Sequence, residues 1–133
     1  MIKRNLEEVK PDIVREPGAK ETTLRRLIDT PDGADRFVMT LFHVSEKGST
    51  PPHYHDWEHE IFVLEGSCKL ILPEEKRSVE IKEGDIIFIP RNEAHGFETA
   101  ENEECKFIVV APTERPPIHN YFLSEESYQF NKK

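Results

Sequence analysis

Cysteine is scarce in this sequence, and long apolar runs are missing from it. The 133 residues include two cysteines, Cys68 and Cys105, which form no C-x-x-C pair, so a disulfide framework is not expected. No window reaches the roughly 18 apolar residues of a membrane span, and residues 1–10 lack the apolar stretch of a signal peptide. We therefore expect a cytoplasmic protein with reduced thiols and no membrane partner.

Positive charge is also in short supply. Lys and Arg number 18 against 26 Asp and Glu, which gives a net charge of −8. Basic residues gather only in pairs such as Lys3-Arg4 and Arg25-Arg26, whereas nucleic-acid binding needs a concentrated basic surface. We therefore expect no nucleic-acid partner. The length fits one domain, which at this size can bury roughly two-thirds of its unfolded surface.

Long helical periodicity is absent as well, because ten prolines and six glycines interrupt the chain. Short β-rich runs occupy residues 24–28, 36–44, 60–66, 67–72, 78–81, 85–90, 95–99 and 105–112. Turn signals such as Glu46-Lys47-Gly48 separate them, and this spacing predicts an all-β sandwich or barrel. Val79 and Ile81 alternate with polar residues, as in an antiparallel sheet with one buried face. In the run at 85–89 the four residues after Asp85 are all apolar, which favours a strand buried on both faces.

The chain divides into an N-terminal arm over residues 1–22, a barrel over 23–112 and a C-terminal tail over 113–133. The arm is polar and is interpreted as a loose edge strand. The tail carries five large apolar side chains, Tyr121, Phe122, Leu123, Tyr128 and Phe130. A solvated tail rarely needs so many, so we expect it to pack on the barrel or on a second subunit. Exposed strand edges also favour a homodimer.

Three histidines gather within seven residues, and a fourth follows later in the chain. His53 and His55 are two apart, so on a strand their rings point to the same face. A turn over residues 56–58 lets His59 approach from the next strand, and His95 stands just after another turn. Neutral imidazole is the commonest metal ligand, so these rings predict a site for one divalent transition metal. The alternative interpretation is that His53, His55 and His59 form a patch on the surface.

Two patterns that contain these histidines resemble the two motifs of the cupin family. The pattern is G-x4-H-x-H-x3-H-x6-G over residues 48–66 and G-x5-P-x-N-x2-H over residues 84–95. The resemblance implies an antiparallel jelly-roll β-barrel, or double-stranded β-helix, of about six to eight strands. It also implies one metal held inside the barrel mouth, and a homodimer. The four-histidine arrangement is similar to that of small single-domain bacterial cupins that bind manganese or similar divalent metals. Manganese is therefore placed first, with Fe, Co, Ni, Cu and Zn open.

The sequence departs from the family pattern at two positions. His59 stands where the first motif usually has its glutamate, seven residues before the closing glycine. Glu60 is displaced by one residue and should face away from His59, although the family pattern also allows a glutamate there. Asn92 replaces the usual glycine of the second motif, and asparagine tolerates the left-handed backbone that such a turn needs. The predicted ligands are thus His53, His55, His59 and His95, with Glu60 as the alternative.

The remaining histidines and the catalytic base are less clearly marked. His43 lies in an alternating strand and is interpreted as a sheet residue, and His119 as a surface residue of the tail, with capping of the mouth as its alternative. Glu58 and Glu93 flank the ligand turns and could be exposed turn residues or a general base. No residue can be named as the base from the sequence.

Apolar side chains are expected to line the mouth of the barrel. The candidate substrate contacts are Phe97, Phe107, Val109, Thr40 and Arg26. Phe97 follows the last histidine by two residues and shares its face, while parity leaves open whether Thr40 or Met39 faces inward. Arg26 and Arg91 are the only basic residues that suggest a contact with a charged substrate. Such a mouth favours small hydrophobic or aromatic ligands over phosphorylated sugars.

Four neutral imidazoles would leave the full +2 charge on the ion, which makes it a stronger Lewis acid than a site with one glutamate. Four protein ligands on an octahedral ion leave two open positions, which permit oxygenation, isomerisation or hydrolysis. We take a metal-dependent, dioxygenase-like oxidoreductase acting on a small, aromatic molecule as the first hypothesis. A non-catalytic small-molecule-binding or sensing protein and a metal-dependent isomerase or lyase are the alternatives.

Overall fold

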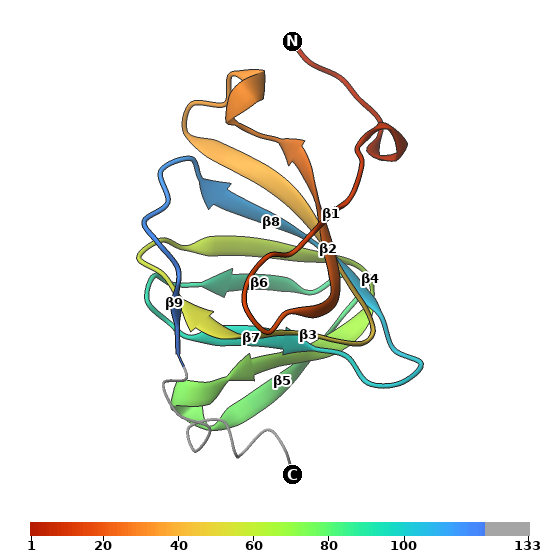
Figure 1. Cartoon of the computed structure of the whole chain (residues 1–133), viewed down its shortest axis with the longest axis vertical. Coiled ribbons are helices and arrows are strands. Elements are labelled where there is room, and N and C mark those ends of the chain that lie inside the picture. The colour runs from red at the N-terminus through yellow and green to blue at the C-terminus, as the bar shows by residue number, and fades with distance from the viewer. Residues whose placement is uncertain (122–133) are drawn as a thin grey trace.

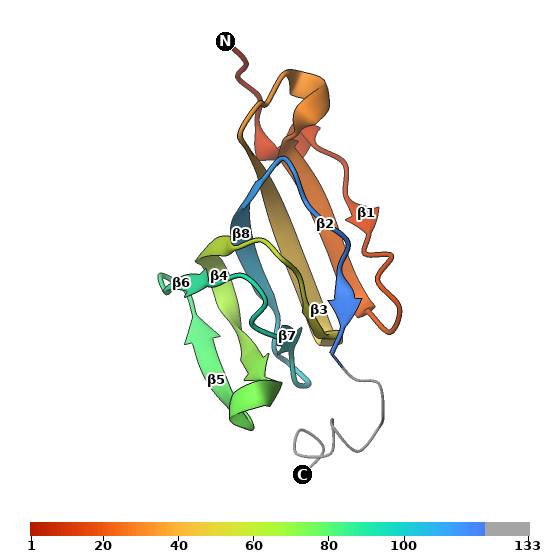
Figure 2. The ribbon, with the colours of Figure 1, turned by 90° about the vertical axis from the view of Figure 1, so that its left-hand side faces the viewer.

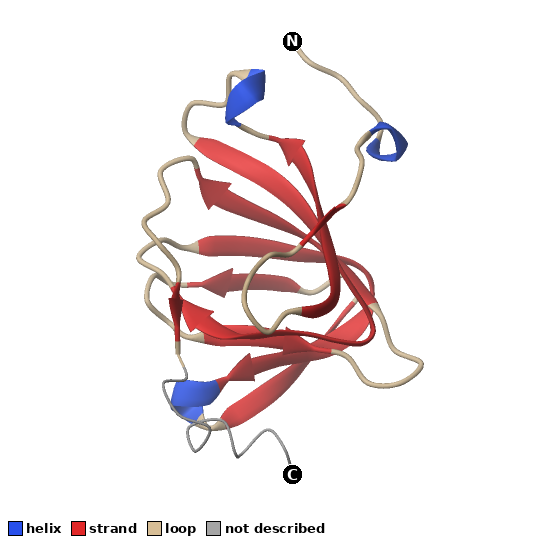
Figure 3. Ribbon diagram, in the orientation of Figure 1, coloured by secondary structure: helices blue, strands red, loops and turns tan. Residues whose placement is uncertain are grey.

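The structure is a computed structural model that describes residues 1–121. Residues 122–133, drawn in grey in Figure 1, lie outside the described residues, and so does the predicted packing of Phe122, Leu123, Tyr128 and Phe130. The strands are β1 (Asp12–Ile13), β2 (Lys20–Ile28), β3 (Phe37–Tyr54), β4 (His59–Leu72), β5 (Arg77–Lys82), β6 (Ile86–Ile89), β7 (His95–Glu98), β8 (Cys105–Pro112) and β9 (His119–Asn120). Three short 3-10 helices accompany the strands: η1 (Leu6–Glu8) precedes β1, and η2 (Thr30–Asp32) and η3 (Pro73–Glu75) lie between strands (Figure 3). Within the described residues, no helix has the length and apolar character that a membrane span requires.

Two long strands, β3 and β4, close the sheet into a barrel. The first half of β3 pairs with β8 and its second half with β7. In the same way, β4 pairs with β8 near its start and with β7 near its end. Because both long strands bond to both β7 and β8, the four strands form a closed antiparallel ring. Figure 2 shows β2 and β3 on one side of this barrel and β5 and β6 on the other. This is the all-β jelly-roll predicted from the sequence.

Alternation along the strands builds the core. In β8 the side chains of Cys105, Phe107 and Val109 are buried, and the residues between them are partly exposed. Buried side chains from β3, β4, β5, β6 and β7 pack against them, as expected for strands with one face turned inward. Cys68 and Cys105 are both buried as free thiols.

Two glycines that the sequence suggests as strand ends lie inside long strands. At Gly48 the chain bulges, since the partners in β2 shift register where β3 runs from Val44 to Ser49. β4 continues past Gly66, which has a φ of 79°, although its register with β8 shifts between Val63 and Glu65. A Cβ there would lie 1.9 Å from the backbone oxygen of Glu104, so only glycine fits. Bulges and turns use the same residue types. For this reason the sequence suggested strand ends at these two glycines.

The prediction that residues 85–89 are buried on both faces is wrong. Ile86 is 83% exposed and Phe88 is 55% exposed, whereas Ile89 is buried at 1%. The segment forms β6, a strand of the barrel wall, so its side chains alternate between core and outer surface. The outer face carries apolar residues that no described element covers.

The two ends of the described chain attach to the barrel near its mouth. The predicted arm contains β1, which pairs with β2 at the edge of the sheet, and also the first residues of β2. In the tail, β9 pairs with the end of β3, where Asn120 lies opposite His53. β9 therefore lies directly beside the strand that carries the first histidines, whereas β2 separates β1 from that strand.

Candidate metal centre

The four predicted histidines meet at one end of the barrel, although they come from distant parts of the chain. His53 is near the end of β3 and His55 follows that strand, while His59 begins β4 and His95 begins β7. All are buried, with exposed fractions of 8%, 1%, 8% and 0% in that order. His53 lies directly opposite His95 in the β3–β7 pairing. Gly96 permits this close approach, because a Cβ there would lie 2.7 Å from the Thr50 oxygen.

Three of these rings converge closely. One ring nitrogen each of His53, His55 and His95 can serve as a ligand atom, and the three atoms all lie within 4.8 Å of one another. The ring centroids are 5.4 Å apart for His53 and His55, and 4.7 Å apart for His53 and His95. His59 stands beside this trio, with its centroid 4.7 Å from that of His55 and 5.3 Å from that of His95. The structure thus groups three ligands, and His59 as a fourth stays a prediction.

The hydrogen bonds of the rings direct particular nitrogens toward the centre. Nδ1 of His55 lies 2.8 Å from the Trp57 oxygen, and Nδ1 of His95 lies 2.9 Å from the Glu93 oxygen. A carbonyl oxygen can only accept, so each Nδ1 carries the proton and each Nε2 keeps its lone pair. Both Nε2 atoms are buried and have no hydrogen-bond partner in the described part of the chain. Buried polar atoms rarely stay unpaired, so this donor set fits a divalent transition metal.

Burial keeps these imidazoles in the neutral form that binds metals. Desolvation lowers the pKa of His55 to about 4 and the pKa of His95 to about 3. The pKa of His59 is also lowered well below 6.5, mainly by burial and then by the neighbouring His95. At neutral pH the rings of His55, His59 and His95 are therefore uncharged, and one nitrogen of each keeps a lone pair from which a metal need displace no proton.

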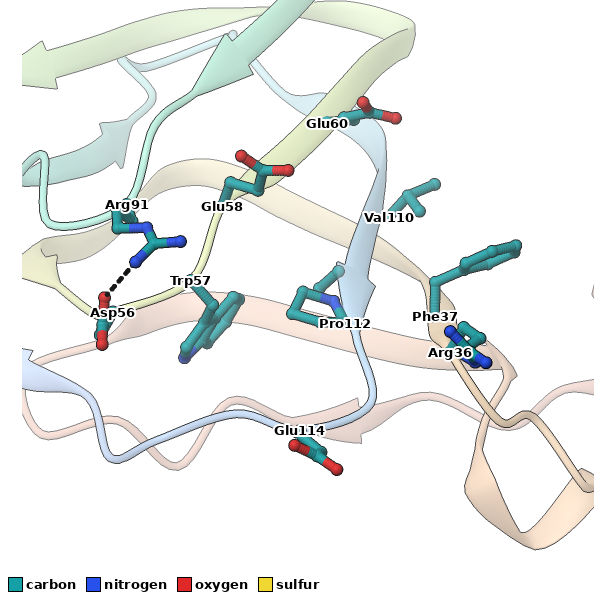
Figure 4. A pocket seen from close by; sticks show the side chains of 11 residues that line it. Arg36, Phe37, Asp56, Trp57, Glu58, Glu60, Arg91, Val110, Pro112 and Glu114 are labelled. Atoms are coloured by element: carbon teal, nitrogen blue, oxygen red, sulfur yellow. Dashed lines mark ion pairs between the residues drawn. The ribbon is translucent and has the colours of Figure 1, made fainter.

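Glu60 lies away from this centre, so the alternative in which it replaces His59 as a ligand is not supported. Its side chain is exposed and faces a groove on the outer side of the barrel (Figure 4). Glu58 lines the same groove, and the ion pair between Arg91 and Asp56, at 3.7 Å, lies at one end of it. Strand alternation places His59 inside and Glu60 outside.

A cavity of about 460 Å³ opens onto the histidines. Phe97, Phe107 and Val109 line it, as the sequence suggests. The rings of Phe97 and Phe107 lie 4.5 Å apart, and Phe42 stacks on Phe107 at 5.6 Å with an interplanar angle of 7°. Trp57 also lines the cavity and stacks on His55 with centroids 3.5 Å apart. The walls are therefore largely aromatic, which suits a flat apolar ligand.

The other two candidate contacts do not line this cavity. Thr40 lies opposite Val109 in the β3–β8 pairing, but it is absent from the cavity walls formed by the described residues. Arg26 has a side chain that is 53% exposed and forms ion pairs with Asp12 and Asp29 at 3.4 and 3.8 Å. Its charge is therefore engaged at the surface.

The remaining histidines have partners of their own. The Nε2 of His43 lies 2.8 Å from a carboxylate oxygen of Glu104, as expected for a sheet histidine. The ring of His119, in β9, lies 5.3 Å from the ring of Tyr54. Neither lines the cavity described above.

Sequence reasoning missed several residues that line the cavity, among them Trp57, Phe42 and Glu16. Trp57 lies midway between His55 and His59, so a period of two along the chain could have placed it on their face. The same period would have placed Phe42 on the opposite face, since it precedes His53 by eleven residues, and the irregularity in β3 between them hides its position. Glu16 also lines the cavity, but no local pattern marks it, because it precedes the first ligand by more than thirty residues.

Comparisons with known proteins agree with this fold. The family model described as the cupin domain matches residues 40–111. The structure of the polyketide cyclase RemF from Streptomyces resistomycificus is 61% identical, with a TM-score of 0.91, and the match covers 100% of this chain and 94% of that one. The cupin-2 domain Rru_A2000 from Rhodospirillum rubrum is 15% identical with a TM-score of 0.80, covering 98% of this chain and 93% of that one, and this likeness shows the fold alone.

Curated relatives are more distant. An uncharacterised protein of Aquifex aeolicus is 32% identical over 101 residues, covering 74% of this chain and 76% of that protein. The uncharacterised HTH-type transcriptional regulator YdeC of Bacillus subtilis is 29% identical over 119 residues, covering 88% of this chain. The chain spans only 37% of that regulator's length.

Proposed function

The chain belongs to the cupin family, and from this premise we propose that it is a metal-dependent enzyme that cyclises an aromatic polyketide. The observation that carries the proposal is the cluster of buried imidazoles at an aromatic-walled cavity. The similarity to the polyketide cyclase of Streptomyces resistomycificus supports this choice of reaction, because the match extends over the whole chain.

The proposal includes one divalent metal held by His53, His55, His59 and His95, as in the four-histidine cupins. Manganese stands first, and Fe, Co, Ni, Cu and Zn remain alternatives, since imidazole suits all of them. When bound, such an ion supplies Lewis-acid polarisation of a carbonyl oxygen. The four imidazoles contribute no negative charge that would weaken this polarisation.

The residues of the cavity would fold and shield the substrate. A polyketide chain carries several carbonyl groups, and ring closure requires one of its carbons to approach a carbonyl carbon elsewhere in the same chain. The flat faces of Phe42, Phe97 and Phe107 would hold the chain in a folded arrangement, which lowers the entropic barrier to closure. Their apolar surfaces, together with Trp57, would exclude water from the reacting groups.

A direct assay uses a matched pair of histidine variants. Wild-type protein loaded with Mn²⁺ is incubated with a linear aromatic polyketide precursor, and the products are followed by liquid chromatography with mass spectrometry. We expect a cyclised product from the wild-type protein and from the His43→Leu control, whose ring lies outside the cavity. The His95→Leu variant should form none above the spontaneous background. Equal activity of His95→Leu and wild type would overturn the proposal.

A dioxygenase-like reaction on a small aromatic molecule is the second candidate. The imidazole donor set favours it, because such ligands also suit redox-active iron, copper and manganese. An oxygen electrode in the same incubation separates the two reactions. Oxygen consumed in proportion to product would support oxygenation, whereas cyclisation without oxygen uptake would support the first candidate.

We further propose that the protein is a cytoplasmic homodimer. Phe62, Ile86 and Phe88 are exposed at 43%, 83% and 55% on the outer face of β4 and β6, and Phe62 pairs with Ile86 across these strands. A contiguous apolar surface of this kind is typical of a subunit interface. Two buried free cysteines, Cys68 and Cys105, are consistent with a reducing compartment.

A further inference from the structure

A carboxylate from outside the two cupin motifs reaches the metal centre. Glu16 lies in the loop between β1 and β2, and its Oε1 lies in close contact with Nδ1 of His53. Both side chains are only 11% exposed. The approach is not aligned as a hydrogen bond, and neither atom has a hydrogen-bond partner among residues 1–121. Oε1 of Glu16 and Nδ1 of His53 therefore face each other as two buried polar atoms.

The loop that carries Glu16 is fixed against the strand of His53. Gly18 has a φ of 88°, and a Cβ at this position would lie 3.0 Å from Cγ of Pro51. The backbone nitrogen of Ala19 donates to the oxygen of Glu16 at 3.0 Å, which closes the turn. Since Pro51 precedes His53 by two residues, this close packing sets the carboxylate beside the imidazole. A glycine is needed here both for the positive φ and for the approach.

The three converging imidazoles share one feature, an oxygen at Nδ1. For His55 and His95 the oxygen belongs to a backbone carbonyl, as described above. For His53 it belongs to the carboxylate of Glu16. For His55 and His95 this oxygen fixes the tautomer and the ring orientation and leaves Nε2 free to face the centre, and the Glu16 carboxylate offers His53 an acceptor at the same nitrogen.

We propose that Glu16 is a positioning residue of the metal centre, which holds the His53 ring and strengthens it as a ligand. The inference rests on the proposed metal site. A carboxylate at the distal nitrogen of a ligating histidine raises the basicity of the ligand, and its removal typically weakens metal affinity by about 10- to 100-fold. The N-terminal segment is thereby a functional part of the site rather than a loose edge of the barrel.

The test measures metal affinity rather than activity. Full-length wild type, Glu16→Gln, Glu16→Asp and the control Glu7→Gln are titrated with Zn²⁺ in the presence of a competing chelator, and with Co²⁺ while its visible absorption is recorded. Glu7 lies in η1 and does not line the cavity within the described residues. We expect Glu16→Gln to bind Zn²⁺ about 10- to 100-fold more weakly than wild type, with a changed Co²⁺ spectrum. Glu16→Asp should recover part of the affinity, and Glu7→Gln should match wild type.

A second variant leaves the carboxylate in place and moves the loop. Gly18→Val adds a side chain where Pro51 leaves no room, so it should also weaken Zn²⁺ binding. The melting temperature of each variant in chelator reports on the fold. A purely structural role of Glu16 would lower this melting temperature in Glu16→Gln, whereas a positioning role leaves it within a degree or two of the wild-type value.

The outcomes separate the inference from the function on which it rests. If wild type binds one Zn²⁺ and Glu16→Gln binds it equally well, the role of Glu16 is refuted and the metal centre stands. If Glu16→Gln loses affinity only together with its metal-free stability, the role of Glu16 is again refuted. If wild type itself binds no stoichiometric metal, the proposed metal centre and the inference both fail.

Discussion

Replacing His95 by leucine should make the metal-free protein no less stable, and at the same time abolish its response to metal. His95 is completely buried, and its Nε2 has no hydrogen-bond partner among the described residues. Leucine has a similar size and carries no polar atom. The substitution therefore removes an imidazole whose burial destabilises the metal-free protein. The same imidazole is required for the protein to bind metal.

The magnitude follows from two opposing terms. A buried polar atom without a partner costs about 1–3 kcal/mol, so its removal stabilises the metal-free protein by roughly that amount. The lost hydrogen bond from Nδ1 to the Glu93 oxygen, 2.9 Å in length, costs about 1 kcal/mol. The net change is about 0 to 2 kcal/mol in favour of the variant. With metal at 100 times its dissociation constant, wild type gains about 2.7 kcal/mol that the variant lacks.

Urea unfolding with chelator and with Zn²⁺ measures both terms. The order of stability should invert, with His95→Leu at least as stable as wild type in chelator and less stable in Zn²⁺. His43→Leu should respond to Zn²⁺ as wild type does. A variant that is several kcal/mol less stable in chelator, or that gains the full stabilisation from Zn²⁺, would refute the reasoning.

Four further predictions concern other parts of the molecule. His59→Ala should weaken Zn²⁺ binding in equilibrium dialysis by at least about tenfold, or about 1.4 kcal/mol, whereas an unchanged affinity would show that three histidines suffice. The metal-free protein should lose stability as the pH falls below about 6.5, because unfolded histidines protonate there while burial holds the pKa of His95 at about 3 in the folded state. At pH 5 this ring alone should cost about 2 kcal/mol in urea unfolding relative to pH 8, and a flat profile between these values would contradict it. Phe62→Glu, on the exposed apolar face, should give monomers in analytical ultracentrifugation, and an intact dimer would place the interface elsewhere. Gly66→Ala should lower the free energy of unfolding by at least about 2 kcal/mol, because its Cβ would overlap the Glu104 oxygen; a loss under about 0.5 kcal/mol would count against it.

Local patterns predicted an all-β fold, and the resemblance to the two cupin motifs added the jelly-roll and the histidine cluster. Alternation revealed the strands, and the motif spacing brought His95 to the other three rings. Asn92 has a φ of 64°, which confirms that asparagine can replace glycine in the second turn. These features depend on short stretches of sequence whose geometry is nearly fixed.

Other features depend on contacts that no short stretch encodes. The exposure of Ile86 and Phe88 could not be inferred from the sequence. An apolar residue in a strand can face either the core or the outer surface, and its identity does not distinguish the two. Glu16 reaches His53 only because its loop packs on Pro51, a contact between distant segments. The sequence likewise could not separate a bulge from a turn at Gly48, since both use the same residue types.

The most direct test is a crystal structure of the protein grown with Mn²⁺ and measured at wavelengths that reveal the metal by anomalous scattering. We predict one ion per chain, bound by ring nitrogens of His53, His55, His59 and His95, with Nδ1 of His53 on the carboxylate of Glu16. An ion at another place, or a centre that stays empty at saturating Mn²⁺ while the four rings keep their positions, would contradict the account.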